Sequence, residues 1–350
     1  MPESVVSVNL PQSAAISYPI RFVQQDGLLR GLRLQDALIT DANLARYYPE
    51  VISAFDRKVI IPAGEKSKSG EMFLHVVESL ADQGQLRKGR MVAFGGGVVG
   101  DLAGFVAATF HRGVPFTQIP TSLLAMVDSS VGGKVGIDLA AGKNLAGAFW
   151  HPTEVLVSPE LLATLPEREF TNGMAEVLKY GWIADQALAD QLALERISLH
   201  HPDLETVIRK CIEIKRDVVQ EDPEERTGRR AILNFGHTVG HALEQILQYE
   251  RLLHGEAIAI GMVAEASIGA AMQLPDYVET LTQTFALYGL PTCPDFPVDL
   301  DQILGVMKRD KKATGDGLAT SLLTGPGECK LYTNVPEPLV RDVLKNLWHS

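Results

Sequence analysis

A glycine-rich run at residues 95–101 constrains the fold of this chain more than any other feature. It reads GGGVVGD and directly follows the apolar run MVAF at residues 91–94. The glycines match the pattern G-x-G-x-x-G, in which missing Cβ atoms let a strand–turn–helix backbone approach a diphosphate at the helix N-terminus. The usual acidic ribose ligand further along is missing, because residues 113–124 contain no Asp or Glu, although Glu65 could supply a carboxylate. The run predicts a strand, a turn and a helix, and leaves dinucleotide binding and a purely structural turn both open.

The rest of the first half repeats the same alternation of strands, turns and helices. Further predicted strands cover residues 59–61, 117–120 and 155–157, and residues 71–83 carry apolar side chains at helical spacing. Such alternation indicates βαβ units and a parallel sheet.

After Pro166 the pattern becomes helical. Predicted helices cover residues 167–194, 202–220, 231–249 and 254–272, with Pro202 in a first turn, and no convincing strand appears until the end. We therefore expect an α/β fold: a Rossmann-like parallel-sheet domain over residues 1–166, followed by a mainly α-helical domain over residues 167–350.

Charge and composition exclude several classes of partner. The 350 residues carry a formal net charge of -11, which argues against binding to nucleic acid or to an anionic membrane. The chain shows no signal peptide and no apolar run of the roughly 20 residues that a membrane span needs. Its 3 cysteines form no close pair, as is typical of a reducing compartment. These features predict a cytoplasmic protein.

A dense polar stretch spans residues 128–144. It combines Asp128, Lys134, Lys143 and Asn144 with a pair of glycines at residues 132–133. A solvated loop is the ordinary explanation of such a stretch. Paired glycines beside a lysine also suit close backbone approach to an anion, and this favours a binding loop.

Histidines at helical spacing indicate a metal site. His237, His241 and Glu244 fall at i, i+4 and i+7, on one face of a helix, and His254 follows closely. Two histidines at this spacing can hold one divalent ion. The helix is not of the zincin type, because Thr238 stands where that motif has a glutamate.

Glu176 and Lys179 lie three residues apart on a predicted helix with apolar neighbours. Such a pair is usually a weak surface contact. If it is buried, each charge needs a metal, a substrate or a partner.

Taken together, these stretches resemble the 3-dehydroquinate synthase family, from about residue 59 to 313. The matching motifs, in order, are the glycine run to Asp101, RGV at 112–114, IPTSLLA at 119–125, VDSSVGGK at 127–134, GKN at 142–144, AEVLK at 175–179, LNFGHT at 233–238, HGE at 254–256 and RDKK at 309–312. The combination is highly specific to this sugar phosphate cyclase family.

The resemblance implies a role for each matching residue. It implies a zinc ion, with cobalt as the alternative, on Glu176, His237 and His254, so that His241 would face the substrate and Glu244 would be structural. It places around the substrate Asp128, Lys134, Asn144, Lys179, Lys215, Arg230, Asn234, His241 and a lysine of the Lys311-Lys312 pair, taken as Lys311. Arg112 resembles an arginine that reaches the phosphate from the other subunit of a homodimer. NAD would lie over Gly96, Gly97 and Val98, with Glu65, Lys68, Asp101, Thr121, Ser122, Lys143 and Thr164 around it.

The activity implied is that of a phosphorus–oxygen lyase of the shikimate pathway, which leads to chorismate and the aromatic amino acids. It would convert the anionic sugar acid 3-deoxy-D-arabino-heptulosonate 7-phosphate to 3-dehydroquinate and phosphate. The alternatives are a sedoheptulose 7-phosphate cyclase, a metal-dependent polyol dehydrogenase and a catalytically inactive binding protein.

Overall fold

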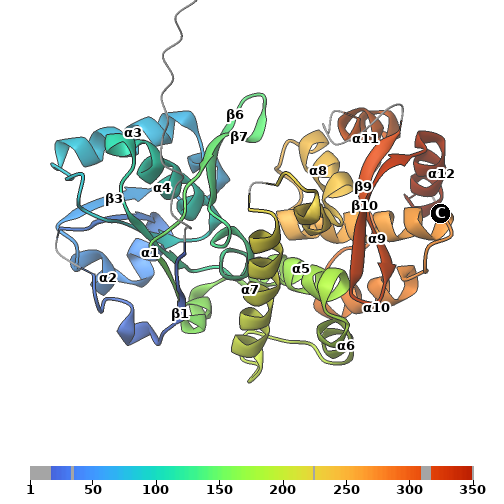
Figure 1. Cartoon of the computed structure of the whole chain (residues 1–350), viewed down its shortest axis with the longest axis horizontal. Coiled ribbons are helices and arrows are strands. Elements are labelled where there is room, and N and C mark those ends of the chain that lie inside the picture. The colour runs from blue at the N-terminus through green and yellow to red at the C-terminus, as the bar shows by residue number, and fades with distance from the viewer. Residues whose placement is uncertain (1–16, 33–34, 224, 309–316, 349–350) are drawn as a thin grey trace, which may run out of the picture.

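The computed structural model describes residues 17–32, 35–223, 225–308 and 317–348. A sheet-containing part and a mainly helical part lie side by side, with α7 (Leu204–Glu221) drawn between them (Figure 1). One apolar cluster includes Val92 of the sheet and Phe285 of the helical part, so the two parts share hydrophobic core. No helix of the described ranges combines the length and apolarity that a membrane crossing requires.

The sheet has six parallel strands in the order β1-β8-β5-β4-β2-β3. In that order the strands are Ile20–Phe22, Glu154–Val157, Phe116–Pro120, Met91–Gly95, Ala37–Asp41 and Arg57–Ile61. The expected parallel sheet is confirmed, and each predicted strand falls within one of these six. Sequence analysis missed the three-residue β1 and the five-residue β2.

The direction of strand addition reverses between β2 and β4. The chain passes from β2 to β3 on one side, then crosses to β4 on the other side and continues to β5. The two strands meet near their carboxyl ends, where Thr40 Oγ1 donates a hydrogen bond of 2.7 Å to the Phe94 carbonyl oxygen. Ligands of open α/β sheets bind at such a reversal. The glycine turn after β4 therefore lies where a ligand is expected.

Both faces of the sheet are buried, as a parallel sheet requires. Along β4, Val92 and Phe94 join one apolar cluster, whereas Met91 and Ala93 join another on the opposite face. The helices of this part are α1 (Ala42–Tyr47), α2 (Pro49–Ser53), α3 (Gly70–Asp82) and α4 (Gly97–Thr109).

The polar stretch at residues 128–144 is not a solvated loop. Residues Ala125–Ser129 form the π-helical turn η4, and β6 (Lys134–Leu139) and β7 (Gly142–Phe149) pair as an antiparallel hairpin. The hairpin packs closely on α4: Val135 lies so near Gly104 that a Cβ at Gly104 would overlap its side chain. The polar residues of this stretch are thus held on a rigid element.

The second part is mainly helical, as expected. The short helix η5 (Pro159–Thr164) ends the first part. The second part contains α5 (Glu167–Ala184), α6 (Gln186–Leu194), α7, η6 (Arg229–Asn234), α8 (His237–Ile246), α9 (His254–Ala271), α10 (Val278–Tyr288), α11 (Leu300–Met307), the antiparallel strands β9 (Leu318–Gly325) and β10 (Glu328–Val335), and α12 (Glu337–Trp348).

Three helix boundaries differ from the prediction. The helix expected over residues 167–194 breaks at Asp185, whose extended backbone ends α5 and whose carboxylate caps α6. The helix expected over residues 231–249 begins only at His237, because Gly236 has the left-handed φ of 82°. Pro202 precedes the N-cap Asp203 and so lies outside α7.

Candidate active site

Three helices bring one carboxylate and two imidazoles together. Glu176 lies within α5, whereas His237 and His254 are the first residues of α8 and α9. Glu176 Oε1 lies 3.3 Å from His237 Nε2 and 3.6 Å from His254 Nε2. Helices α8 and α9 can pack this closely because glycines face each other, and a Cβ at Gly261 would overlap the Gly236 carbonyl oxygen. The group has the donor atoms of a divalent-metal site.

Electrostatics keep the carboxylate of this group charged. Burial favours the neutral form, but Lys179 and the two imidazoles outweigh it and hold the pKa of Glu176 well below its usual value. Burial also disfavours a charged His254, yet the carboxylates of Glu244 and Glu176 raise its pKa to about 10. One charged carboxylate and two imidazoles whose donor atoms face one another form a group that can hold a cation.

The hydrogen bonding of the Glu176 carboxylate also fits a metal ion at this group. Within the described part of the chain, neither oxygen of the Glu176 carboxylate receives a hydrogen bond of regular geometry. Oε1 faces the two Nε2 atoms, and the side chain of Glu176 is only 1% exposed. Oε2 forms an ion pair with Lys179, and a cation between Oε1 and the two Nε2 atoms would satisfy the other oxygen of this buried carboxylate.

His241 lies at the open side of this group. Its side chain is 59% exposed, and its ring centroid is 5.1 Å from that of His237. A second possible ligand group consists of His241, Glu244 and His254, so the two groups share one histidine. The predicted helical face of His237, His241 and Glu244 therefore lies at the site. Glu176 of α5 adds a possible ligand from a distant part of the sequence.

A second charged cluster lies beside the metal-type group. Lys215 of α7 is 7% exposed, and its Nζ lies 2.8 Å from Asp128 Oδ1 and 2.5 Å from the Asp128 carbonyl oxygen. Tyr180 Oη donates a hydrogen bond of 2.6 Å to the same Oδ1 atom. Burial lowers the pKa of Lys215, and Lys215 in turn overcomes the burial of Asp128 and lowers the pKa of that carboxyl. Tyr180 of this cluster directly follows Lys179 on α5, and Lys179 pairs with Glu176, so the cluster adjoins the metal-type group.

Two expected substrate residues share the short helix η6. Arg230 is buried, donates from its NH1 atom to the Pro223 carbonyl oxygen at 3.0 Å, and packs close to Gly132. Its Nε donates no hydrogen bond to any residue that the structure describes. Asn234 ends the same element, two residues before the turn into α8. A guanidinium with a free buried donor suits an anionic group.

Other expected residues show no contact with these clusters among the described residues. Lys134 is half exposed and pairs with Glu225 at 2.5 Å. Arg112 follows α4, whose 13 residues carry it roughly 20 Å from the glycine turn. Lys311 and Lys312 lie outside the described residues.

The residues expected around a nucleotide gather near the carboxyl ends of β4 and β5. Gly96 and Gly97 begin α4, and a Cβ on them would lie 3.4 and 3.3 Å from the Ser122 and Ser129 hydroxyl oxygens. Thr121 N donates to the Gly95 carbonyl oxygen at 3.0 Å. Val98 follows in the first turn of α4, and Thr164 lies 3.2 Å from the hydroxyl of Tyr48, which packs on Phe94.

An ion-pair network continues this region onto the hairpin. Lys68 Nζ lies 2.6 Å from Asp101 Oδ2 and donates to Asn144 Oδ1 at 2.6 Å. Lys143 Nζ lies 3.4 Å from Glu65 Oε1. Asn144, expected at the substrate, thus contacts a lysine expected at the nucleotide.

Sequence analysis missed Asp41 and Glu265. Asp41 ends β2 at the strand reversal, the place where ligands of open α/β sheets bind, and its Oδ1 atom accepts hydrogen bonds from Asn43 N and Leu44 N as the N-cap of α1. It was missed because β2 itself was not recognised. Glu265 of α9 is fully buried and accepts hydrogen bonds from Gly236 N (2.8 Å) and Val239 N (3.1 Å), and so caps α8 at His237. Its signal was a single acid within the apolar second half of a helix.

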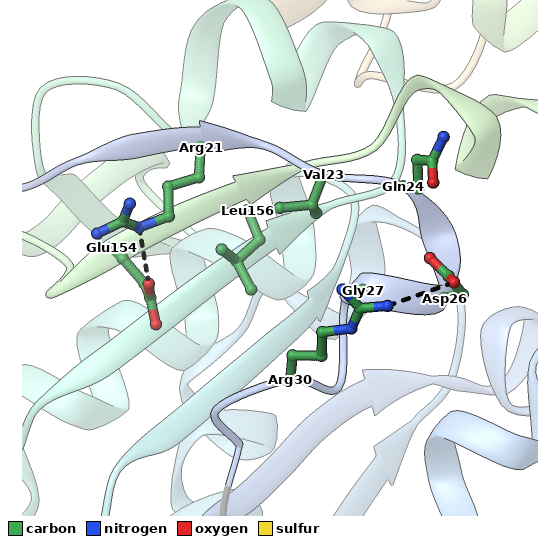
Figure 2. Close-up of a pocket in the computed structure, with 8 residues that line it drawn as sticks. All are labelled: Arg21, Val23, Gln24, Asp26, Gly27, Arg30, Glu154 and Leu156. Atoms are coloured by element: carbon green, nitrogen blue, oxygen red, sulfur yellow. Dashed lines mark ion pairs between the residues drawn. The ribbon is translucent and has the colours of Figure 1, made fainter.

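A surface pocket lies away from these clusters. It measures about 340 Å³ and is lined by Arg21, Val23, Gln24, Asp26, Gly27, Arg30, Glu154 and Leu156. Figure 2 shows its arginines directed at acids, with Arg21 Nε 3.6 Å from Glu154 Oε2 and Arg30 NH2 3.6 Å from Asp26 Oδ2. The pocket lies at the β1 edge of the sheet, shares no residue with the clusters above, and presents no comparable chemistry.

The fold and these clusters define a two-part α/β protein in which a glycine turn of a parallel sheet accompanies a carboxylate–imidazole group on helices. Two solved structures share the fold over nearly the whole chain. One is 2-epi-5-epi-valiolone synthase from Streptomyces hygroscopicus subsp. jinggangensis with NAD+ and Zn2+ bound (TM-score 0.87, 25% identity, 97% of this chain and 99% of that chain). The other is 2-deoxy-scyllo-inosose synthase complexed with carbaglucose-6-phosphate, NAD+ and Co2+ (TM-score 0.81, 27% identity, 93% and 96%).

Sequence comparison identifies the family. The model described as 3-dehydroquinate synthase N-terminal matches residues 58–172, and that described as 3-dehydroquinate synthase C-terminal matches residues 173–313. The 3-dehydroquinate synthase of Rippkaea orientalis is 39% identical over 97% of this chain and 98% of its own length. That of Methylacidiphilum infernorum is 46% identical over 77% of each chain. The chain belongs to the 3-dehydroquinate synthase family, which confirms the expectation from its motifs.

Proposed function

We propose that this chain converts 3-deoxy-D-arabino-heptulosonate 7-phosphate to 3-dehydroquinate and phosphate, in the shikimate pathway to chorismate and the aromatic amino acids. Membership of the family supports this activity. The observation that carries it in the structure is the group of Glu176, His237 and His254 beside the buried Lys215–Asp128 pair. A metal-type site next to buried cations suits a phosphorylated sugar acid.

NAD and a divalent metal, zinc or cobalt, are the proposed cofactors, since the solved relatives above were obtained with NAD+ and Zn2+ or Co2+. The metal would be held by Glu176, His237 and His254, and when bound it would stabilise negative charge on a substrate oxygen. NAD would lie over the glycine turn and accept, then return, a hydride. Asp41 is added to its proposed contacts because of its position at the strand reversal.

Phosphate must leave from C7, but the hydrogen on the neighbouring C6 is not acidic in the substrate. Oxidation of the C5 hydroxyl to a ketone acidifies the C6 hydrogen, so that phosphate is eliminated. Reduction at C5, ring opening and an intramolecular aldol step then close the carbocycle. Lys179, Lys215 and Arg230 would bind the anionic groups and hold one conformer of a flexible substrate. His241, at the open side of the cluster, and Asn234 would orient the substrate and move protons.

The substrate is tested by phosphate release from two sugars in parallel. With NAD and zinc present, we expect rapid release from 3-deoxy-D-arabino-heptulosonate 7-phosphate and little from sedoheptulose 7-phosphate. The reason is that Arg230, whose Nε is free among the described groups, would pair with a carboxylate that only the first sugar has. Release from sedoheptulose 7-phosphate alone would assign the chain to the other cyclases, against this proposal.

We also propose that the enzyme is a cytoplasmic homodimer, with residues 1–166 and 167–350 as its two domains. The position of Arg112, beyond the far end of α4, supports a role for this residue in the partner's site. Arg112→Ala and Glu176→Gln should each abolish activity. A mixture of the two refolded or co-expressed should regain about one quarter of wild-type activity, because half of the dimers are mixed and each has one complete site. A mixture with no activity would show that Arg112 acts within its own chain, and an active Arg112→Ala protein would show that Arg112 has no role in the reaction.

A further inference from the structure

Glu244 has contacts that the proposed reaction does not explain. It lies on α8, and its side chain is 3% exposed. Its Oε2 atom lies 3.3 Å from His254 Nδ1, and its Oε1 atom lies 3.4 Å from Lys143 Nζ. Burial of a carboxylate costs free energy unless each oxygen has a partner. Both oxygens of Glu244 have one, so both contacts need an explanation.

The contact with His254 decides how that ring can act. His254 Nδ1 faces Glu244, whereas His254 Nε2 faces Glu176 Oε1 at 3.6 Å. A proton on Nδ1 that is donated to Glu244 leaves the lone pair of Nε2 directed at the metal-type group. Metal-binding histidines commonly have such a partner on the second nitrogen, and it fixes both the tautomer and the ring orientation.

The contact with Lys143 joins the two parts of the molecule. Lys143 belongs to β7 of the hairpin, and its Nζ also lies 3.4 Å from Glu65 Oε1 and 4.3 Å from the centroid of the Tyr249 ring. The hairpin packs on α4, the helix that follows the glycine turn. Glu244 thus connects Lys143, which is expected near the nucleotide, with His254 of the metal-type group.

We propose that Glu244 is a positioning residue: it orients His254 for the metal and is itself held by Lys143, so that the hairpin supports the metal site. This inference rests on the proposed function, because it requires that Glu176, His237 and His254 bind a metal. In the alternative arrangement, Glu244 would be a direct ligand together with His241 and His254.

Zinc affinity of the metal-free protein, measured by competition with a chromophoric chelator, tests this inference without any assay of activity. Glu244→Ala is expected to weaken zinc binding about 10- to 100-fold, as loss of an outer-shell partner does. Glu244→Gln retains an oxygen that can accept from Nδ1, and should weaken binding less than Glu244→Ala. Lys143→Met should weaken it a few-fold, with no further loss when it is combined with Glu244→Ala, because the two act in series.

Two matched variants control for other effects. Glu65→Gln removes the other carboxylate at Lys143 but has no contact with His254, and should leave zinc affinity unchanged. His241→Ala should also leave it unchanged, whereas a large loss would place the metal on the second group and overturn the inference. Unaltered affinity in Glu244→Ala, with wild-type protein binding zinc, would also overturn it. Wild-type protein that binds no zinc would refute the proposed function itself.

Discussion

His237→Ala is expected to abolish zinc binding and turnover while leaving the fold intact. His237 is the first residue of α8, so its loss costs the helix little. It supplies one of the two imidazoles facing Glu176 Oε1, at 3.3 Å. A direct ligand should matter more than an outer partner, so zinc affinity should fall by more than the roughly 10- to 100-fold typical of outer-shell changes.

The measurement is zinc affinity by chelator competition, with circular dichroism and denaturant unfolding as checks on the fold. His75→Ala is the matched control, because His75 is an exposed residue of α3 in the sheet part. It should change neither affinity nor activity. If His237→Ala binds zinc as tightly as the wild type, the metal lies elsewhere, and the assignment of the three ligands is wrong.

Lys215→Met is expected to lower both activity and stability. Removal of this cation leaves the half-buried Asp128 carboxylate with one hydrogen bond, from Tyr180, among the residues that the structure describes. Breaking a buried pair on one side costs about 3 kcal/mol of unfolding free energy where one partner keeps some exposure. Loss of a charged contact to the reacting groups should lower kcat on the order of 10²- to 10³-fold.

A double variant separates the two effects. Lys215→Met combined with Asp128→Leu removes both charges, so that much of the unfolding free energy should return. Its activity should remain absent, because the cation is still missing. Lys210→Met is the control on the same helix: its partner Asp185 lies 3.0 Å away at the surface, and its loss should cost less than about 1 kcal/mol. Near-normal turnover in Lys215→Met would remove this residue from the proposed substrate site.

Local sequence predicted the elements that have a strong local signal. Strand β4 and helix α4 were predicted because an apolar run, a glycine turn and a helical pattern follow one another directly. Strand β1 has three residues and no distinctive flanks, so nothing local marks it. The hairpin β6–β7 was not predicted because its strands carry many small and polar residues. Its position depends on packing against α4, for example of Val135 on Gly104.

The site shows the same division. The spacing of His237, His241 and Glu244 placed them on one helical face, and all three lie at the site. Periodicity within a helix cannot show that Glu176 arrives from α5, because that contact depends on how the helices pack. The start of α8 was also misjudged, since only the left-handed backbone of Gly236 and the cap from Glu265 fix it at His237.

The proposed function requires that NAD be used and regenerated within one turnover beside a metal held by Glu176, His237 and His254. Its most direct test supplies the zinc-loaded protein with 3-deoxy-D-arabino-heptulosonate 7-phosphate and NAD far below the substrate concentration, and follows phosphate and NADH together. We expect many phosphates to be released per NAD, with no accumulation of NADH. NADH that accumulates without phosphate release would contradict it and identify a dehydrogenase.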